Sequence, residues 1–271
     1  MERIRRNERM AVLTKLLTAA PNRIFTLSHF CDLFGTAKST LSEDIDILRD
    51  VFDGFGLGKL ETVTGAAGGV RYRAFMQKQD AHAFLEELCH ELCTTSRVLP
   101  GGFLYLSDML SMPDVVAKMG VIIASEFYEA APDFVLTMET KGIPVALMTA
   151  RSMGVPLVIA RRSSKVYEGS AVNINYVSGS AGHIETMSLS RRAVKEGQRA
   201  LIVDDFLKAG GTAKGMVDLM GEFNVTVVGT AFVMSTSLPQ AKRITGEKSL
   251  MVMDSEFNEP EELNIHPAQW L

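Results

Sequence analysis

The run RALIVDDFLKAGGTAKG, residues 199–215, decides the fold of this chain. It begins with a short apolar segment rich in branched side chains, residues 200–203, which predicts a buried central strand. Two carboxylates, Asp204 and Asp205, follow at once, and a glycine-bearing loop then leads into a helical pattern. A strand, an acidic pair, a loop and a helix in this order predict a binding site for a sugar phosphate at the end of the strand.

The loop supplies the groups that bind an anion. Gly210 and Gly211 let the backbone approach a phosphate, with N–H groups exposed at a helix start where the helix dipole favours negative charge. Asp204 and Asp205 suit the two hydroxyls of a ribose, because ionised carboxylates only accept hydrogen bonds. A glycine pair alone also fits an ordinary turn, whereas the whole combination favours the site. The predicted phosphate loop consists of Lys208, Ala209, Gly210, Gly211 and Thr212.

This run resembles the phosphoribosyl-pyrophosphate (PRPP) signature of the type I phosphoribosyltransferases. In that family the two acids hold the ribose hydroxyls and the loop holds the 5′-phosphate. Two other phosphate-binding patterns are absent from the sequence, the GxxxxGK[ST] string of P-loops and the GxGxxG string of dinucleotide sites.

Length and composition indicate a globular chain of two domains. The chain has 271 residues, of which 46% are hydrophobic and 22% charged. No apolar run reaches the ~18 residues that span a bilayer, and no secretory signal opens the chain. Three cysteines without a CxxC pattern and five scattered histidines predict a reduced, cytoplasmic protein with no metal site and no membrane partner.

The charge is divided unevenly along the chain. Residues 1–75 carry 11 Lys+Arg against 9 Asp+Glu, a net charge of +2, whereas the remainder carries 17 against 23, a net charge of −6. An acidic body with a mildly basic head predicts that the first segment alone meets a polyanion.

The first 75 residues predict a winged helix. Helical patterns run to about residue 19, through residue 34 and over 38–52, and Gly35 lies in the turn between the second and third. This is the order of a helix-turn-helix. Two alternating segments, 59–64 and 70–75, flank a glycine-rich turn and predict a β-hairpin, the wing.

Candidate DNA contacts come from three places in this head: its arginine-rich start, the opening turn of the third helix and the wing. Four acids, Glu43, Asp44, Asp46 and Asp50, would be repelled by DNA, so we expect only the N-terminal end of that helix to be inserted. A small head of this kind also serves for dimerisation or protein interaction. The modest charge implies a dimer, since phosphate contacts add up. The candidates are Arg3, Arg5, Arg6, Lys38, Ser39, Thr40, Ser42, Arg71 and Arg73.

Residues 76–271 predict a second domain with an open parallel sheet, because strands alternate with helices from residue 134 onward. The loop ETKGIP, residues 139–144, offers Thr140, Lys141 and Gly142 to an anion. It resembles the pyrophosphate loop of purine phosphoribosyltransferases, particularly the xanthine-type enzymes. A basic cluster that includes Arg161 follows a strand at the same edge, as a further anion contact or a solvated group.

Taken together, the winged head, ETKGIP, NINYVSGS…IETMSLS and LIVDDFLKAGGT resemble the purine-operon repressors of the phosphoribosyltransferase-fold type over nearly the whole chain. The resemblance implies a homodimer without catalytic activity. It would bind control regions of purine synthesis and transport genes and leave DNA when PRPP binds. Ser180 lies where transferases of this fold carry a flexible loop over PRPP. Guanosine tetraphosphate is implied as a competing ligand, and participation of Mg²⁺ stays open.

An alternative assigns the same loops to catalysis. An active purine phosphoribosyltransferase with a fused head would need the same PRPP site. The predicted wing, and the lack of a segment that would form a base-binding hood, favour the repressor.

Overall fold

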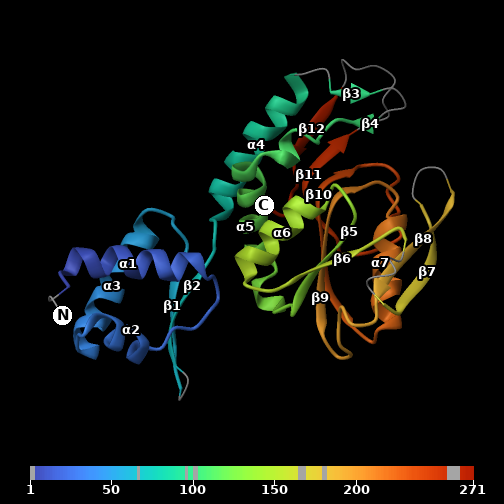
Figure 1. The fold of residues 1–271 in the computed structure, drawn as a ribbon. Coiled ribbons are helices and arrows are strands. Elements are labelled where there is room, and N and C mark those ends of the chain that lie inside the picture. The colour runs from blue at the N-terminus through green and yellow to red at the C-terminus, as the bar shows by residue number, and fades with distance from the viewer. Residues whose placement is uncertain are drawn as a thin grey trace. The chain divides into compact units, whose positions relative to one another are not determined.

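The computed structural model describes residues 4–65, 68–94, 97–99, 103–163, 169–178, 182–254 and 263–271. Two compact units make up the chain (Figure 1). One runs to Gln77 and includes Arg151–Gly154, and the other comprises Lys78–Ala150 and Val155–Leu271. None of the described helices is long and apolar enough to cross a membrane.

The first unit contains three helices followed by a two-stranded antiparallel hairpin, the predicted winged helix-turn-helix (Figure 1). Its core forms because apolar side chains recur every three or four residues along the helices, as with Leu13 and Leu17, or Leu41, Ile45 and Leu48. The elements are α1 (Arg6–Ala19), α2 (Leu27–Phe34), α3 (Lys38–Gly54), β1 (Lys59–Val63) and β2 (Gly69–Arg73).

Local signals set the bounds of the turn between α2 and α3. The Thr26 hydroxyl caps α2 by accepting a hydrogen bond from the His29 N–H at 3.2 Å. Gly35 ends α2 in the left-handed region, at φ 60°, which glycine adopts without steric cost. Helix α3 then starts after Ala37 without a side-chain cap, so the hydroxyls of its first turn are not used for capping.

A buried ion pair joins α1 to α3. The Asp44 side chain is fully buried, and its two carboxylate oxygens accept from Arg9 at 2.8 Å and from Arg6 at 2.7 Å. Arg6 also reaches Glu43 at 3.3 Å. The expectation that Asp44 faces and repels DNA is therefore wrong, because this acid belongs to the core of the head.

Replacing Asp44 by alanine is expected to destabilise the head by about 3–5 kcal/mol, since the buried Arg9 guanidinium would lose its counter-charge. Hydrogen exchange of the α1 and α3 amides measures this loss. Asp50→Ala, at an exposed acid of the same helix, is the matched control and should change protection by no more than about 0.5 kcal/mol. Equal protection in the two variants would contradict a structural role for the ion pair.

The second unit is built on a six-stranded sheet of order β12-β11-β10-β9-β5-β6, in which only the edge strand β12 runs antiparallel to its neighbour. This confirms the predicted α/β class. The elements are α4 (Lys78–Thr94), β3 (Val98–Leu99), β4 (Phe103–Leu104), η1 (Met109–Ser111), α5 (Pro113–Glu126), η2 (Tyr128–Ala130), β5 (Phe134–Met138), α6 (Ile143–Met153), β6 (Leu157–Ala160), β7 (Ala171–Val177), β8 (Ile184–Ser190), β9 (Arg199–Leu207), α7 (Gly211–Glu222), β10 (Thr226–Thr236), β11 (Lys248–Asp254) and β12 (Asn264–Pro267).

Helices cover both faces of this sheet. Helix α7 and the hairpin β7–β8 lie on one face, and α5 and α6 lie on the other (Figure 1). On the α7 side, Phe134, Leu136 and Ile202 of the sheet pack with Met216 and Leu219 of the helix. Strands buried on both faces read as continuous apolar runs, which is why β9 was recognisable from its sequence.

Strand β11 is not evident from the sequence. Its apolar centre, Leu250–Met253, is short and includes two methionines, which carry no strand preference. The strand is stabilised by its neighbours instead. It pairs with β10 on one side and β12 on the other, and the Trp270 indole N–H donates to the Ser249 carbonyl at 2.6 Å.

Candidate functional site

The acidic pair lies where two neighbouring strands separate. Strand β5 pairs with β9 only up to Leu136 and Ile202, whereas β9 continues beside β10 to Leu207. Asp204 and Asp205 therefore lie within β9 rather than after it. The space that opens beside them receives the loop that follows β5.

Gly142 of that loop approaches Asp204 very closely. A Cβ atom on Gly142 would lie 1.9 Å from Asp204 Oδ1 and 2.6 Å from Thr137 Oγ1. The structure thus brings together the ETKGIP loop and the acidic pair, which are about 60 residues apart in the sequence. Only glycine fits at this contact.

The two carboxyls differ in environment. Asp204 is 7% exposed, and burial, followed by the charge of Asp205, raises the pKa of its carboxyl well above the ordinary value. Burial also raises the pKa of Asp205, while the nearby Lys141 ammonium opposes that rise. The Thr137 hydroxyl donates a long hydrogen bond, 3.4 Å, to Asp204. The two carboxyls offer hydrogen-bond acceptors at a poorly hydrated place. Such a place suits the binding of a diol better than acids on a solvated surface would.

The phosphate loop has the geometry of an anion cradle. Gly210 caps α7 at φ 80°, and the first helical bond runs from the Lys214 N–H to the Gly210 carbonyl. The N–H groups of the turn before Lys214 therefore have no partner within the helix. The whole predicted loop, Lys208–Thr212, lines a pocket of about 150 Å³ together with Asp204. Backbone donors, a helix start and the Asp204 carboxyl thus face one space, in the way that a ribose phosphate requires.

Arg243 was missed by the sequence reasoning. Its N–H donates to the Ala209 carbonyl at 3.0 Å, and its exposed side chain donates to the Val177 carbonyl at 3.3 Å. The residue thus joins the phosphate loop to the hairpin β7–β8. Its neighbour Lys242 donates to the Thr236 carbonyl at 2.8 Å, and burial lowers the pKa of its ammonium. The sequence signal that could have identified Arg243 is a Lys-Arg pair shortly after β10, the strand that neighbours β9.

A chain of charged groups connects the ligand loops. Glu139, which opens ETKGIP, accepts from the Arg162 N–H at 2.7 Å and pairs with the Arg161 guanidinium at 3.7 Å. The Arg162 guanidinium pairs with Glu185, which also accepts from the Tyr176 hydroxyl at 2.7 Å. Arg161 thus lies at the predicted edge of the sheet, held by the first acid of the ETKGIP loop.

Tyr176 extends this chain to the phosphate loop. Burial, then Glu185, raises the pKa of its hydroxyl to about 12, against opposing effects of Arg162 and of a hydrogen bond with Thr212. Groups from both predicted loops are therefore linked through one hairpin. Ser180, the candidate in the loop of that hairpin, lies outside the described residues.

The candidate DNA contacts divide into exposed and paired groups. Lys38, Ser39 and Ser42 are exposed in the first turns of α3, whereas Thr40 is partly buried. Arg71 and Arg73 both pair with Glu61 across the hairpin, at 2.7 and 3.5 Å. Arg5 is exposed just before α1, Arg6 pairs with acids of α3, and Arg3 lies outside the described residues.

Metal ligation finds no support in the part of the chain that the structure describes. No group of three or more His, Cys, Asp or Glu side chains there could hold a metal ion. The acidic pair contributes two carboxylates, so a divalent cation at this place would need oxygens from a bound ligand.

A winged helix-turn-helix and a phosphoribosyltransferase-type sheet with its ligand loops define a class of protein: DNA-binding transcriptional regulators built on the phosphoribosyltransferase fold. Residues 5–74 match the family described as "Bacterial purine repressor, N-terminal", and residues 107–265 match the phosphoribosyl transferase domain. The chain belongs to the PurR family of bacterial purine biosynthesis transcriptional regulators.

Relatives in this family match almost end to end. The purine biosynthesis transcriptional repressor PurR of Bacillus subtilis is 40% identical over 99% of this chain and 94% of its own length. The purine biosynthesis transcriptional activator PurR of Lactococcus lactis is 39% identical over 93% of each chain. The protein is accordingly a DNA-binding transcriptional regulator of purine biosynthesis.

Two enzymes that resemble this chain match a smaller share of it than these regulators do. Xanthine phosphoribosyltransferase of Geobacillus thermodenitrificans is 30% identical over 62% of this chain and 89% of its own length. The structure of adenine phosphoribosyltransferase from Rhodothermus marinus superposes with a TM-score of 0.53 at 22% identity, covering 62% of this chain and 96% of that one. This second likeness shows the fold.

Proposed function

We propose that the protein represses genes of purine synthesis and transport, and that PRPP bound at the acidic pair releases it from DNA. The observation that carries the ligand assignment is the meeting of three parts in one place. Asp204 lies against Gly142 of one loop and lines the pocket of the Lys208–Thr212 loop. A diol acceptor between two anion loops matches a ribose that bears a phosphate at one end and a pyrophosphate at the other.

The roles follow from the chemistry of each group. Asp204 and Asp205 accept from the ribose hydroxyls, and Lys208–Thr212 hold the 5′-phosphate. Thr140–Gly142 hold the pyrophosphate, with Arg161 at the edge of that subsite. We assign DNA binding to residues 1–75 and PRPP binding to residues 76–271. The protein works as a cytoplasmic homodimer, because one head of net charge +2 offers little attraction for DNA.

A gel-shift assay on the control regions of purine genes tests the proposal directly. The protein should shift this DNA, and PRPP should reverse the shift. A coupling of about 1–3 kcal/mol gives a change in affinity of about 5–150-fold. DNA binding that is indifferent to PRPP would remove the release mechanism. In vitro transcription from the same DNA decides the sign of regulation, because relatives in Lactococcus lactis are named activators.

Guanosine tetraphosphate is proposed as a competitor at the same site. Two anion loops flanking a diol acceptor accommodate a nucleotide with phosphates at two positions. It should displace labelled PRPP and maintain the DNA complex. Titrations with and without Mg²⁺ show whether the cation takes part. Incubation with PRPP and each purine base serves as the catalytic control, and robust nucleotide formation would contradict a site used only for sensing.

The Lys38 ammonium is expected to contact a DNA phosphate, because it is exposed at the start of α3. Lys38→Gln should weaken DNA binding and lower the slope of log K against log[salt] by about 1. Arg71→Gln should have a smaller effect, since Glu61 already pairs with that guanidinium. Fluorescence anisotropy over a salt series measures both slopes. An unchanged slope for Lys38→Gln would place that residue away from the phosphates.

A further inference from the structure

The first unit contains the end of helix α6 in addition to the winged head. Its members Arg151–Gly154 are the last three residues of that helix and the glycine that follows. The same helix begins at Ile143, inside the loop ETKGIP of the candidate ligand site. This helix of 11 residues, about 16 Å long, therefore has its first turn at the ligand loop and its last residues in the compact unit of the head.

The start of α6 is continuous with the ligand loop. The Ala146 N–H donates its helical hydrogen bond to the Gly142 carbonyl at 3.0 Å, so the loop residue that lies against Asp204 is bonded into the first turn. The helix packs closely on α5, because a Cβ on Gly120 of α5 would lie 2.6 Å from the carbonyl carbon of Met148. Packed helices respond to small displacements by sliding as rigid bodies, so a shift of the loop is carried along α6.

The other end of α6 is held by Asn22, in the turn that follows α1. The Asn22 side-chain amide donates to the Ser152 carbonyl at 3.3 Å and to the Met153 carbonyl at 2.8 Å. The last carbonyls of a helix have no partner within the helix, so this amide caps α6. Gly154 permits the close approach, because a Cβ there would lie 2.3 Å from the Pro21 carbonyl oxygen. All of these residues belong to the first unit.

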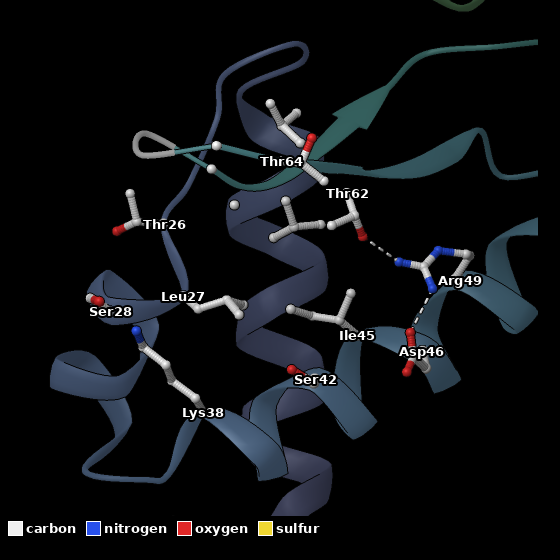
Figure 2. A pocket seen from close by; sticks show the side chains of 15 residues that line it. Thr26, Leu27, Ser28, Lys38, Ser42, Ile45, Asp46, Arg49, Thr62 and Thr64 are labelled. Atoms are coloured by element: carbon white, nitrogen blue, oxygen red, sulfur yellow. Dashed lines mark hydrogen bonds and ion pairs between the residues drawn. The ribbon is translucent and has the colours of Figure 1, made fainter.

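From Asn22 the contacts continue into the wing. The Asn22 backbone N–H donates to the Tyr72 carbonyl of β2 at 2.7 Å, and Tyr72 pairs with Leu60 of β1. The Leu60 carbonyl accepts from Arg49 Nε of α3 at 3.1 Å. Figure 2 shows the same guanidinium reaching Thr62 of β1. Hydrogen bonds and one strand pair thus connect the end of α6 to α3, the helix whose start carries candidate DNA contacts.

We propose that α6 couples the ligand site to the head, and that Asn22 is the positioning residue at the end of this helix. The proposal rests on the proposed function and adds the part of the chain through which PRPP controls DNA binding. A pyrophosphate held by the Thr140–Gly142 N–H groups displaces the start of α6, and the carbonyls at its end move with it. The Asn22 amide follows these carbonyls, and its backbone N–H passes the shift to β2 and, through Arg49, to α3.

Helix α7 offers an internal comparison. It also begins at a ligand loop, at Gly211, but the asparagine just beyond its far end, Asn224, donates through its side-chain amide to Glu196 at 3.2 Å. Asn224 and Glu196 both belong to the second unit. Asn22 and Asn224 share a left-handed backbone, at φ 60° and 52°, which glycine adopts without strain. The two asparagines therefore give a matched pair of glycine variants.

Asn22→Gly removes the amide that caps α6 and keeps the backbone N–H that bonds to Tyr72. Fluorescence anisotropy should give this variant the wild-type affinity for purine-gene DNA in the absence of PRPP. Saturating PRPP should lower the DNA affinity of the wild type and of Asn224→Gly by about 5–150-fold, and that of Asn22→Gly by less than about twofold. Asn22→Asp keeps the shape of the side chain but replaces its donor by a carboxylate, so it should also lose the response to PRPP.

Isothermal titration in the absence of DNA should give both Asn22 variants the wild-type affinity for PRPP, so that a lost response is not a lost ligand. If PRPP releases the wild type and both Asn22 variants by the same factor, α6 does not couple the two activities. Loss of PRPP affinity in these variants would equally contradict a role in coupling alone. If PRPP does not release the wild type, the proposed function itself fails, and the coupling fails with it.

Hydrogen exchange in the wild type tests the same coupling without a substitution. PRPP should change the protection of the Asn22 amide, which bonds to the Tyr72 carbonyl, and of the Gly154 and Val155 amides at the end of α6. The Asn224 amide, at the end of α7, should change less. Unchanged protection of the Asn22, Gly154 and Val155 amides on PRPP binding would overturn the coupling through α6.

Discussion

Replacing Gly142 by alanine is expected to weaken PRPP binding by roughly 10–150-fold, because displacing the loop removes at least one hydrogen bond to a charged group, worth about 1.5–3 kcal/mol. The new Cβ would lie 1.9 Å from Asp204 Oδ1 and 2.6 Å from Thr137 Oγ1. Both atoms belong to buried strands, so the mobile partner is the loop itself. Its displacement would move the Thr140–Gly142 N–H groups away from the proposed pyrophosphate subsite and would disturb an oxygen that we propose accepts from the ribose.

Gly221→Ala is the matched control for this substitution. Gly221 lies in α7, and nothing stands within 4 Å of an added Cβ there. Gly221 is the second-last residue of this helix, so alanine there should leave PRPP affinity unchanged and stabilise the chain by at most roughly 0.5–1 kcal/mol. Isothermal titration with PRPP compares the two variants. Wild-type affinity in Gly142→Ala would show that the loop after β5 takes no part in holding the ligand.

The two loops of the candidate site could be picked out from the sequence, because each is contained in a short run. A continuous apolar segment before Asp204 signals a buried parallel strand, and the glycines after it signal a helix start that is open to an anion. In contrast, the contact between Gly142 and Asp204 depends on where β5 and β9 stop pairing. No local sequence pattern shows over how many residues two strands pair when they are distant in the sequence.

Residues that act through distant partners were misjudged or not noticed in the sequence. Asp44 reads as one of four acids on a surface helix, and only the packing of α1 against α3 buries it beside Arg9. Arg243 lies in a segment without periodicity, and its place is fixed by the Ala209 carbonyl at the other end of the site. Arg49 likewise serves the wing from a helix. Each depends on tertiary contacts that override local propensity.

Replacing Asp204 by asparagine is expected to change stability and ligand affinity in opposite directions. Burial and the charge of Asp205 raise the pKa of the Asp204 carboxyl in the folded protein. Between the ordinary pKa of an aspartate, about 3.9, and this raised value, the folded chain keeps a proton that the unfolded chain releases. The free energy of unfolding therefore falls as pH rises through that window, and the loss is complete above the folded-state pKa.

Asparagine carries no charge and removes this dependence. At neutral pH, ligand-free Asp204→Asn should unfold at a higher temperature than the wild type. The rise is roughly 2–4 °C for each 1 kcal/mol that the substitution adds to the free energy of unfolding. The difference should vanish as pH falls below about 4, where both folded and unfolded Asp204 become protonated. Thermal unfolding across this range measures the trend. Asp218→Asn, at an exposed acid of α7 that pairs with Lys214, is the control and should show no such convergence.

The affinity of Asp204→Asn for PRPP should fall, whereas its thermal stability rises. The carboxylate of Asp204 accepts hydrogen bonds at both oxygens, whereas the amide presents an N–H₂ donor in place of one acceptor. Loss of a hydrogen bond to a charged group costs about 1.5–3 kcal/mol, or roughly 10–150-fold in affinity. A variant that is more stable and binds less tightly would show that Asp204 is retained for the ligand. If Asp204→Asn bound PRPP as the wild type does, the buried acid would need another explanation, and the ribose would have to lie against Asp205 alone.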